Sequence, residues 1–123
     1  MKLKTLGLTA AAAAIVTLPA SAHHSHGNYI MTEYTHLTGV VQDIHLVNPH
    51  SWLFVEVMDE DGEAVVWAVE SASAGGLRRQ GITEETVKPG DTVSMRCHQL
   101  RDGSNGCLLG WLTSPDGVER EWD

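Results

Sequence analysis

Length, composition and charge limit what this chain of 123 residues can be. It carries eight basic and sixteen acidic side chains, a formal net charge of −8 at pH 7. Because nucleic-acid affinity comes largely from Lys and Arg, we expect neither nucleic acid nor an anionic membrane surface as a partner, whereas cations and neutral or basic partners stay open.

The first 22 residues have the pattern of a cleaved export signal. Two lysines give a positive start, residues 6–18 are largely apolar, and Ala20 and Ala22 are the small residues of a cleavage site. The apolar run is too short to span a bilayer comfortably, and no later stretch approaches about 18 apolar residues. We expect removal of 1–22, no membrane insertion afterwards, and a periplasmic or secreted product of 101 residues with a formal charge of −10.

A cut after Ala22 would place a histidine-rich segment, residues 23–35, at the mature N-terminus. His23, His24 and His26 then lie beside a free terminal amine, and such a nitrogen set favours Cu(II), with Zn and Ni as further candidates. A cut after Ala20 would also create a chelate, from the amine, two backbone nitrogens and the third-position imidazole. The alternative is a loose terminal tail without a biological metal.

Alternating β-forming residues predict five strands, over residues 37–44, 52–58, 63–70, 92–98 and 107–113. The acidic turn at 59–62 joins the second and third strands into a hairpin. Ser71 or Ser73 can cap a short helix that reaches Gln80 and ends at Gly81.

This order of elements predicts an all-β fold. Five strands with a short helix between the third and the fourth are typical of a small OB-like Greek-key barrel, and an open β-sandwich is the alternative. We assign the barrel to residues 36–115, and the last eight residues, 116–123, to a polar tail.

Cys97 and Cys107 flank a turn rich in Asp, Gly, Ser and Asn. A turn centred on Asp102 would set the two cysteines opposite each other and favour a cross-strand disulfide. A turn centred between Gly103 and Ser104 would instead set Cys97 opposite Gly110 and leave two thiols out of register. Disulfides form outside the cytoplasm, so we expect the bridge.

Four residues of the predicted barrel are candidates for a ligand site: His50, Trp52, Trp67 and Glu70. His50 lies in the rigid approach to the second strand and is a further candidate metal ligand, although a turn with satisfied backbone groups explains it equally well. The tryptophans are more simply core residues. Glu70 has no partner base or nucleophile that the sequence identifies, and no catalytic motif is present, so we do not expect an enzyme.

Five ordered motifs give the chain a resemblance to a known family. They are His23-His24-Ser25-His26-Gly27-Asn28-Tyr29, Asn48-Pro49-His50-Ser51-Trp52, Trp67-Ala68-Val69-Glu70, Lys88-Pro89-Gly90-Asp91 and Leu100-Arg101-Asp102-Gly103. With them the mature chain resembles an uncharacterised family of small exported bacterial proteins, a domain of unknown function, and more distantly it is similar to secreted bacterial OB-fold proteins. The resemblance implies an exported single-domain β protein and no particular activity. The cysteine pair is not part of that family's pattern.

Two hypotheses about function follow. In the first, a periplasmic barrel binds copper or another divalent transition metal through His23, His24 and His26, joined by His50. In the second, a non-catalytic envelope barrel binds an unknown ligand or protein partner around His50, and the N-terminus is only a tail.

Overall fold

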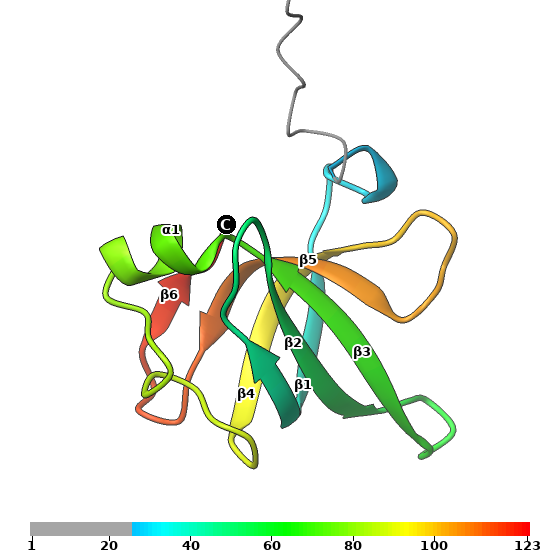
Figure 1. Cartoon of the computed structure of the whole chain (residues 1–123). Coiled ribbons are helices and arrows are strands. Elements are labelled where there is room, and N and C mark those ends of the chain that lie inside the picture. Colours follow the sequence, from blue (N-terminus) through cyan, green and yellow to red (C-terminus); the bar gives the residue numbers. More distant parts are fainter. Residues whose placement is uncertain (1–25) are drawn as a thin grey trace, which may run out of the picture.

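A computed structural model describes residues 26–123; the predicted export signal, His23 and His24 lie outside the described residues. The described chain forms one sheet with a short 3-10 turn before it and a short helix beside it (Figure 1). In chain order the elements are η2 His26–Asn28, β1 Thr35–His45, β2 Ser51–Met58, β3 Ala64–Ser71, α1 Ala74–Arg79, β4 Thr92–Gln99, β5 Gly106–Thr113 and β6 Glu119–Glu121.

The sheet closes on itself. Its strand order is β3-β2-β1-β4-β5-β6, and a further parallel pairing joins β3 to β5. That pairing sets Ala68 beside Gly106 and Glu70 beside Leu108. The predicted five-stranded OB-like barrel, with its one helix between the third and fourth strands, is thereby confirmed in preference to the open sandwich.

The long first strand, β1, pairs with two neighbouring strands. Residues Thr35–Val40 pair with β4, and the stretch from Val40 to His45 pairs with β2, with a register shift between Val41 and Asp43. At Gly39 a side chain would overlap the carbonyl oxygen of Glu56. A glycine there lets the two strands approach closely at the point where β1 changes partner.

Alternation along the strands builds the core. In β2 the residues Leu53, Val55 and Val57 are buried, while the residues between them are more exposed. Trp67 and Val69 of β3 belong to the same hydrophobic cluster, which lies inside the barrel. Side chains that alternate with them on these two strands therefore lie on the outer face of the sheet.

The helix closes one end of the barrel. Ser73 is its N-cap, and the Ser73 hydroxyl accepts a hydrogen bond from the Gly76 amide at 3.1 Å. Gly81 follows with a positive φ of 82°, which ends the helix as predicted. Leu77 of the helix and Ile82 after it are fully buried in the core cluster.

Cys97 and Cys107 form a disulfide, with their Cα atoms 5.6 Å apart. The predicted bridge is confirmed. The register that would set Cys97 opposite Gly110 holds from Ser94 to Arg96, but a register shift after Arg96 sets Cys97 opposite Leu109 and Cys107 opposite Gln99, so neither predicted register holds at the cysteines. An offset of two residues keeps both side chains on the core face, because side chains on a strand alternate with a period of two. The bridge therefore runs diagonally between the two strands.

The C-terminal residues 116–123 are part of the fold, which corrects the prediction of a polar tail. Residues Glu119–Glu121 form β6 against β5, and the Trp122 side chain is completely buried in the core cluster. The Trp122 amide donates to the Gly110 carbonyl at 2.8 Å. The polar residues around Trp122 hid this anchor, because a single apolar residue shows no periodicity.

Among residues 26–123, no helix has the length and apolar character needed to cross a membrane.

Substitution of Gly39 tests the close approach of β1 and β2. We predict that Gly39→Ala lowers the free energy of unfolding by about 2 kcal/mol, because the added methyl group must displace backbone. Urea unfolding measures the change. Gly27→Ala is the matched control, since nothing lies within 4 Å of a Cβ there. Equal midpoints for Gly39→Ala and the wild type would contradict the strand crossing described here.

Candidate functional site

His50 and Glu70 lie side by side at the open end of the β2–β3 hairpin, the end opposite its turn. The His50 Nδ1 atom is 2.6 Å from Glu70 Oε1. His50 directly precedes β2, and Glu70 lies near the end of β3, where it is the register partner of Trp52. The antiparallel register thus brings together two residues that are 20 positions apart in the sequence.

Glu70 is a buried carboxylate outside the barrel core. The residue is 5% exposed, and it alternates with Val69, which points into the core. Glu70 therefore lies on the outer face of β3, beside Leu108 of β5, which is 2% exposed and is not a member of the core cluster. A buried carboxylate needs donors to replace water, so its partners are structurally important.

Tyr29 supplies the second donor. Its hydroxyl donates a hydrogen bond to Glu70 Oε2 at 2.6 Å, and the whole residue is 4% exposed. Burial, together with the hydrogen bond to Glu70, raises the pKa of Tyr29 well above its ordinary value of 10.0. Tyr29 therefore stays protonated at neutral pH and remains a hydrogen-bond donor.

The two contacts of Glu70 determine which nitrogen of His50 carries a proton. One carboxylate oxygen accepts from Tyr29, and the other lies at hydrogen-bond distance from His50 Nδ1. A carboxylate can only accept, so Nδ1 must donate its hydrogen. In the neutral imidazole the lone pair is then on Nε2, and 31% of the His50 side chain remains exposed to solvent.

The segment that carries Tyr29 is bound to the barrel along its length. The Ile30 amide donates to the Gln99 carbonyl at 2.9 Å, and the Arg101 amide donates to the Asn28 carbonyl at 2.9 Å. The Arg101 Nε group also donates to the Gly27 carbonyl at 3.1 Å. From residue 26 onward, the predicted histidine-rich segment is therefore part of the fold.

His98 fixes the end of this segment. Its Nδ1 atom lies 3.0 Å from the Ile30 carbonyl oxygen and 2.7 Å from the Glu33 carbonyl oxygen, so it must donate to them. Its ring also stacks on Tyr34 with centroids 4.5 Å apart. His98 is 9% exposed, and we assign it a structural role.

The C-terminus lies near the same place. The Ala72 amide, just after β3, donates to the Trp122 carbonyl, and the Ser51 amide, just after His50, donates to the Ala72 carbonyl. The His26 Nε2 atom is 4.0 Å from the Asp123 carboxylate, with both side chains partly exposed. The described part of the N-terminal segment therefore reaches both the Glu70 pair and the last residue.

The structure brings some predicted site residues together and separates others. His50 and Glu70 are in contact, and Trp52 lies opposite Glu70 on the neighbouring strand. Trp67 is a core residue on the other face of β3, so it does not share a site with Glu70. His26 is beside Asp123, while His23 and His24 lie outside the described residues. Tyr29 belongs to the first of the five motifs, but nothing in the sequence marked its contact with Glu70.

Within the described part of the chain, no three His, Cys, Asp or Glu side chains are grouped so that they could hold a metal ion. That part offers Nε2 of His50, a nitrogen that the Glu70 carboxylate orients on a side chain that is 31% exposed, whereas His98 is 9% exposed. Further ligands would have to come from His26 after a rearrangement, or from the histidines that precede it.

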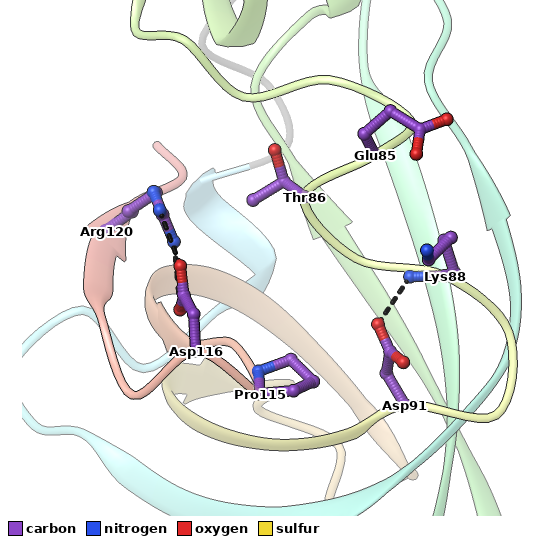
Figure 2. A pocket seen from close by; sticks show the side chains of 7 residues that line it. All are labelled: Glu85, Thr86, Lys88, Asp91, Pro115, Asp116 and Arg120. Carbon is purple, nitrogen blue, oxygen red and sulfur yellow. Dashed lines mark hydrogen bonds and ion pairs between the residues drawn. The ribbon is translucent and has the colours of Figure 1, made fainter.

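A polar hollow of about 400 Å³ lies away from these residues, between the loop before β4 and the turn before β6 (Figure 2). Arg120 is paired with Asp116 there at 2.9 Å, and the Lys88 amide donates to Asp91 at 2.9 Å. The hydrogen bond from Arg120 holds the pKa of Asp116 well below its usual range. This hollow contains none of the predicted site residues, and we regard its contacts as structural.

Substitution of Tyr29 tests the buried pair. We predict that Tyr29→Phe lowers the free energy of unfolding by about 1–2 kcal/mol at pH 7, because Glu70 loses a buried donor. Folding raises the pKa of Tyr29, so its contribution is present below pH 10 and declines as the pH rises further. Urea unfolding at pH 7 to 11 should show the difference between variant and wild type becoming smaller above about pH 10.

The matched control for this experiment is Tyr34→Phe. Tyr34 is 41% exposed, and its hydroxyl has no hydrogen bond to another described residue. A Tyr29→Phe variant as stable as the wild type at pH 7 would argue against the contact with Glu70.

Comparison with known proteins places the chain in a family. No curated protein matches it, and no solved structure matches it. Residues 11–109 match the family described as a family of unknown function, DUF6152. The match includes the histidine-rich segment, Tyr29, His50 and Glu70, and it ends within β5. The chain is therefore a member of DUF6152, a family of unknown function.

Proposed function

We propose that this protein is an exported, periplasmic metal-binding barrel that holds copper, or a similar divalent transition metal, between His50 and the histidines of its mature N-terminus. The proposal has no catalytic step. It assigns His50 as the ligand supplied by the barrel, and His23, His24 and His26 as the ligands supplied by the preceding segment.

The observation that carries the proposal is the contact between His50 Nδ1 and the buried Glu70 carboxylate at 2.6 Å. A metal-binding histidine commonly donates its other ring N–H to a carboxylate, which orients the ring and makes the free nitrogen a better ligand. Glu70 has this relation to His50, and Tyr29 holds the opposite carboxylate oxygen in place. The arrangement prepares Nε2 of His50 to accept a metal.

Chain length supports the participation of the N-terminal histidines. Tyr29 shares Glu70 with His50, and His24 precedes Tyr29 by five residues. An extended chain covers at most about 3.3–3.6 Å per residue, so five residues span up to about 18 Å. That span is long enough for the histidines to meet His50.

The chemistry of the donors favours copper. Imidazole nitrogens and a terminal amine suit Cu(II), Zn(II) and Ni(II), and a tetragonal set of nitrogen ligands is typical of Cu(II) and Ni(II). Copper has the highest affinity of these divalent metals for such ligands. The Cys97–Cys107 bridge uses both thiols of the chain, so no cysteine competes as a ligand.

The alternative function is a non-catalytic envelope barrel that binds a ligand or protein through His50, Trp52 and Glu70. The half-buried Trp52 opposite Glu70 favours this second candidate. It differs from the first in one respect that can be tested: replacement of His23, His24 and His26 by Ala should leave binding of the partner intact. Pull-down from envelope extracts with and without that replacement distinguishes the two.

Titration with Cu(II) tests the metal proposal. The exported protein is purified, its N-terminal residue is established by mass, and copper binding is followed by electron spin resonance. We predict nitrogen coordination, and a loss of affinity of about tenfold or more in two variants, His50→Ala and the triple replacement of His23, His24 and His26 by Ala.

The control for His50 is His45→Ala. His45 is also paired with a carboxylate, Asp43, at 2.9 Å, but 53% of its side chain is exposed and it lies at the end of β1. Its removal should leave the affinity unchanged. Copper binding that is weak and unaffected by the triple replacement would refute the proposal.

A further inference from the structure

A second cavity opens at the far end of the β2–β3 hairpin. It has a volume of about 350 Å³ and is lined from β1, β2, β3 and the loop before β5. Its lining includes His36, Val57, Met58, Val65 and Trp67. His50 directly precedes β2, and Met58 is the last residue of β2. This cavity and the pair formed by His50 and Glu70 therefore lie at opposite ends of β2.

The cavity arises where β1 changes partner. Before Val40 the first strand pairs with β4, whereas β2 beyond Glu56 pairs only with β3. The two strands diverge from this point, and the wall of the barrel is open between them. In Figure 1 the turn that joins β2 to β3 extends away from the barrel at the lower right, on the opposite side from η2.

A methionine and a histidine, two residue types that can bind metal ions, lie at the opening. Met58 is 62% exposed, the most exposed of the large hydrophobic residues that the structure describes. His36 is exposed as well, and its imidazole has no hydrogen bond or ion pair with the rest of the described chain. One strand thus offers an available nitrogen and the other an available thioether sulfur.

The inner wall adds an aromatic ring. Trp67 is 8% exposed and belongs to the core cluster, yet it also lines the cavity. Its indole N–H has no hydrogen-bond partner within residues 26–123, but it is not among the buried groups left without a partner. The N–H edge of the indole is therefore accessible, and the residue forms part of the inner wall of the cavity.

The charge at the opening is negative. Asp59 and Glu60 lie on its edge, and no Lys or Arg lines the cavity. The nearby cation is Arg96, the register partner of His36 on β4, and it is paired with Glu119 at 2.7 Å. The Asp61 and Glu63 amides donate to Asp59 Oδ1 at 2.9 and 2.8 Å, which fixes this carboxylate at the edge of the opening. Negative charge around an opening raises the local concentration of cations.

We propose that this opening binds a soft monovalent metal ion, Cu(I) or its analogue Ag(I), through the His36 imidazole and the Met58 thioether, with Trp67 behind the ion. Thioether and imidazole ligands together select Cu(I) over hard cations. The site is separate from the Cu(II) ligands at His50 and does not depend on them. The chain then has one nitrogen-rich site for the oxidised ion and one soft site for the reduced ion.

Ag(I) is the probe, because it is monovalent and does not change its oxidation state. The full mature chain is labelled with ¹⁵N and at its methionine methyl groups, and NMR follows an Ag(I) titration. The protein carries the triple replacement of His23, His24 and His26 by Ala, so that the terminal histidines do not compete. We expect the Met58 methyl and the Trp67 indole resonances to shift together, and the methyl resonances of Met31 and Met95 to keep their chemical shifts.

Two variants complete the test. His36→Ala and Met58→Leu should each weaken Ag(I) binding by about tenfold or more. Both residues are exposed, so both variants should fold. Met31→Leu is the matched control, since Met31 is 39% exposed and lies away from the cavity. Unchanged affinity in Met58→Leu, or Ag(I)-induced shifts that spare Met58 and Trp67, would overturn the proposal without bearing on the Cu(II) site.

Discussion

The link between the N-terminal segment and the barrel depends on one buried carboxylate, that of Glu70. Glu70 is 5% exposed and lies outside the core, so it cannot be stabilised by water and must be stabilised by donors. Tyr29 supplies one donor and His50 the other. This requirement links the segment before the barrel to the start of β2, and it leaves the second nitrogen of His50 free.

The barrel itself was largely predictable, because its signals are local. Alternation and turn residues placed five strands within two residues of their observed ends. Of the two predicted N-caps, Ser71 and Ser73, the helix uses Ser73, and Gly81 follows its end as predicted. What failed depended on distant contacts. Trp122 is buried because β6 pairs with β5, and the disulfide is diagonal because the β4–β5 register is offset by two residues.

The candidate site was predictable only in part. The acidic turn after Met58 makes β2 and β3 a hairpin, and its register places Trp52 opposite Glu70. His50 and Glu70 could each be singled out, but their contact depends on how the chain before β2 is oriented. The sequence could not assign Tyr29 to the site, because it belongs to a segment that precedes the barrel. The position of that segment is fixed by backbone hydrogen bonds to Gln99 and Arg101.

The most direct test of the central claim is the protonation of the His50 ring in the metal-free wild type at neutral pH. Long-range ¹H–¹⁵N NMR correlations distinguish a ring nitrogen that carries hydrogen from one that does not. We predict hydrogen on Nδ1 and a bare Nε2 in the neutral ring, because both oxygens of Glu70 accept hydrogen bonds. A neutral ring with its hydrogen on Nε2 would contradict the role assigned to Glu70 and, with it, the orientation of His50 toward a metal.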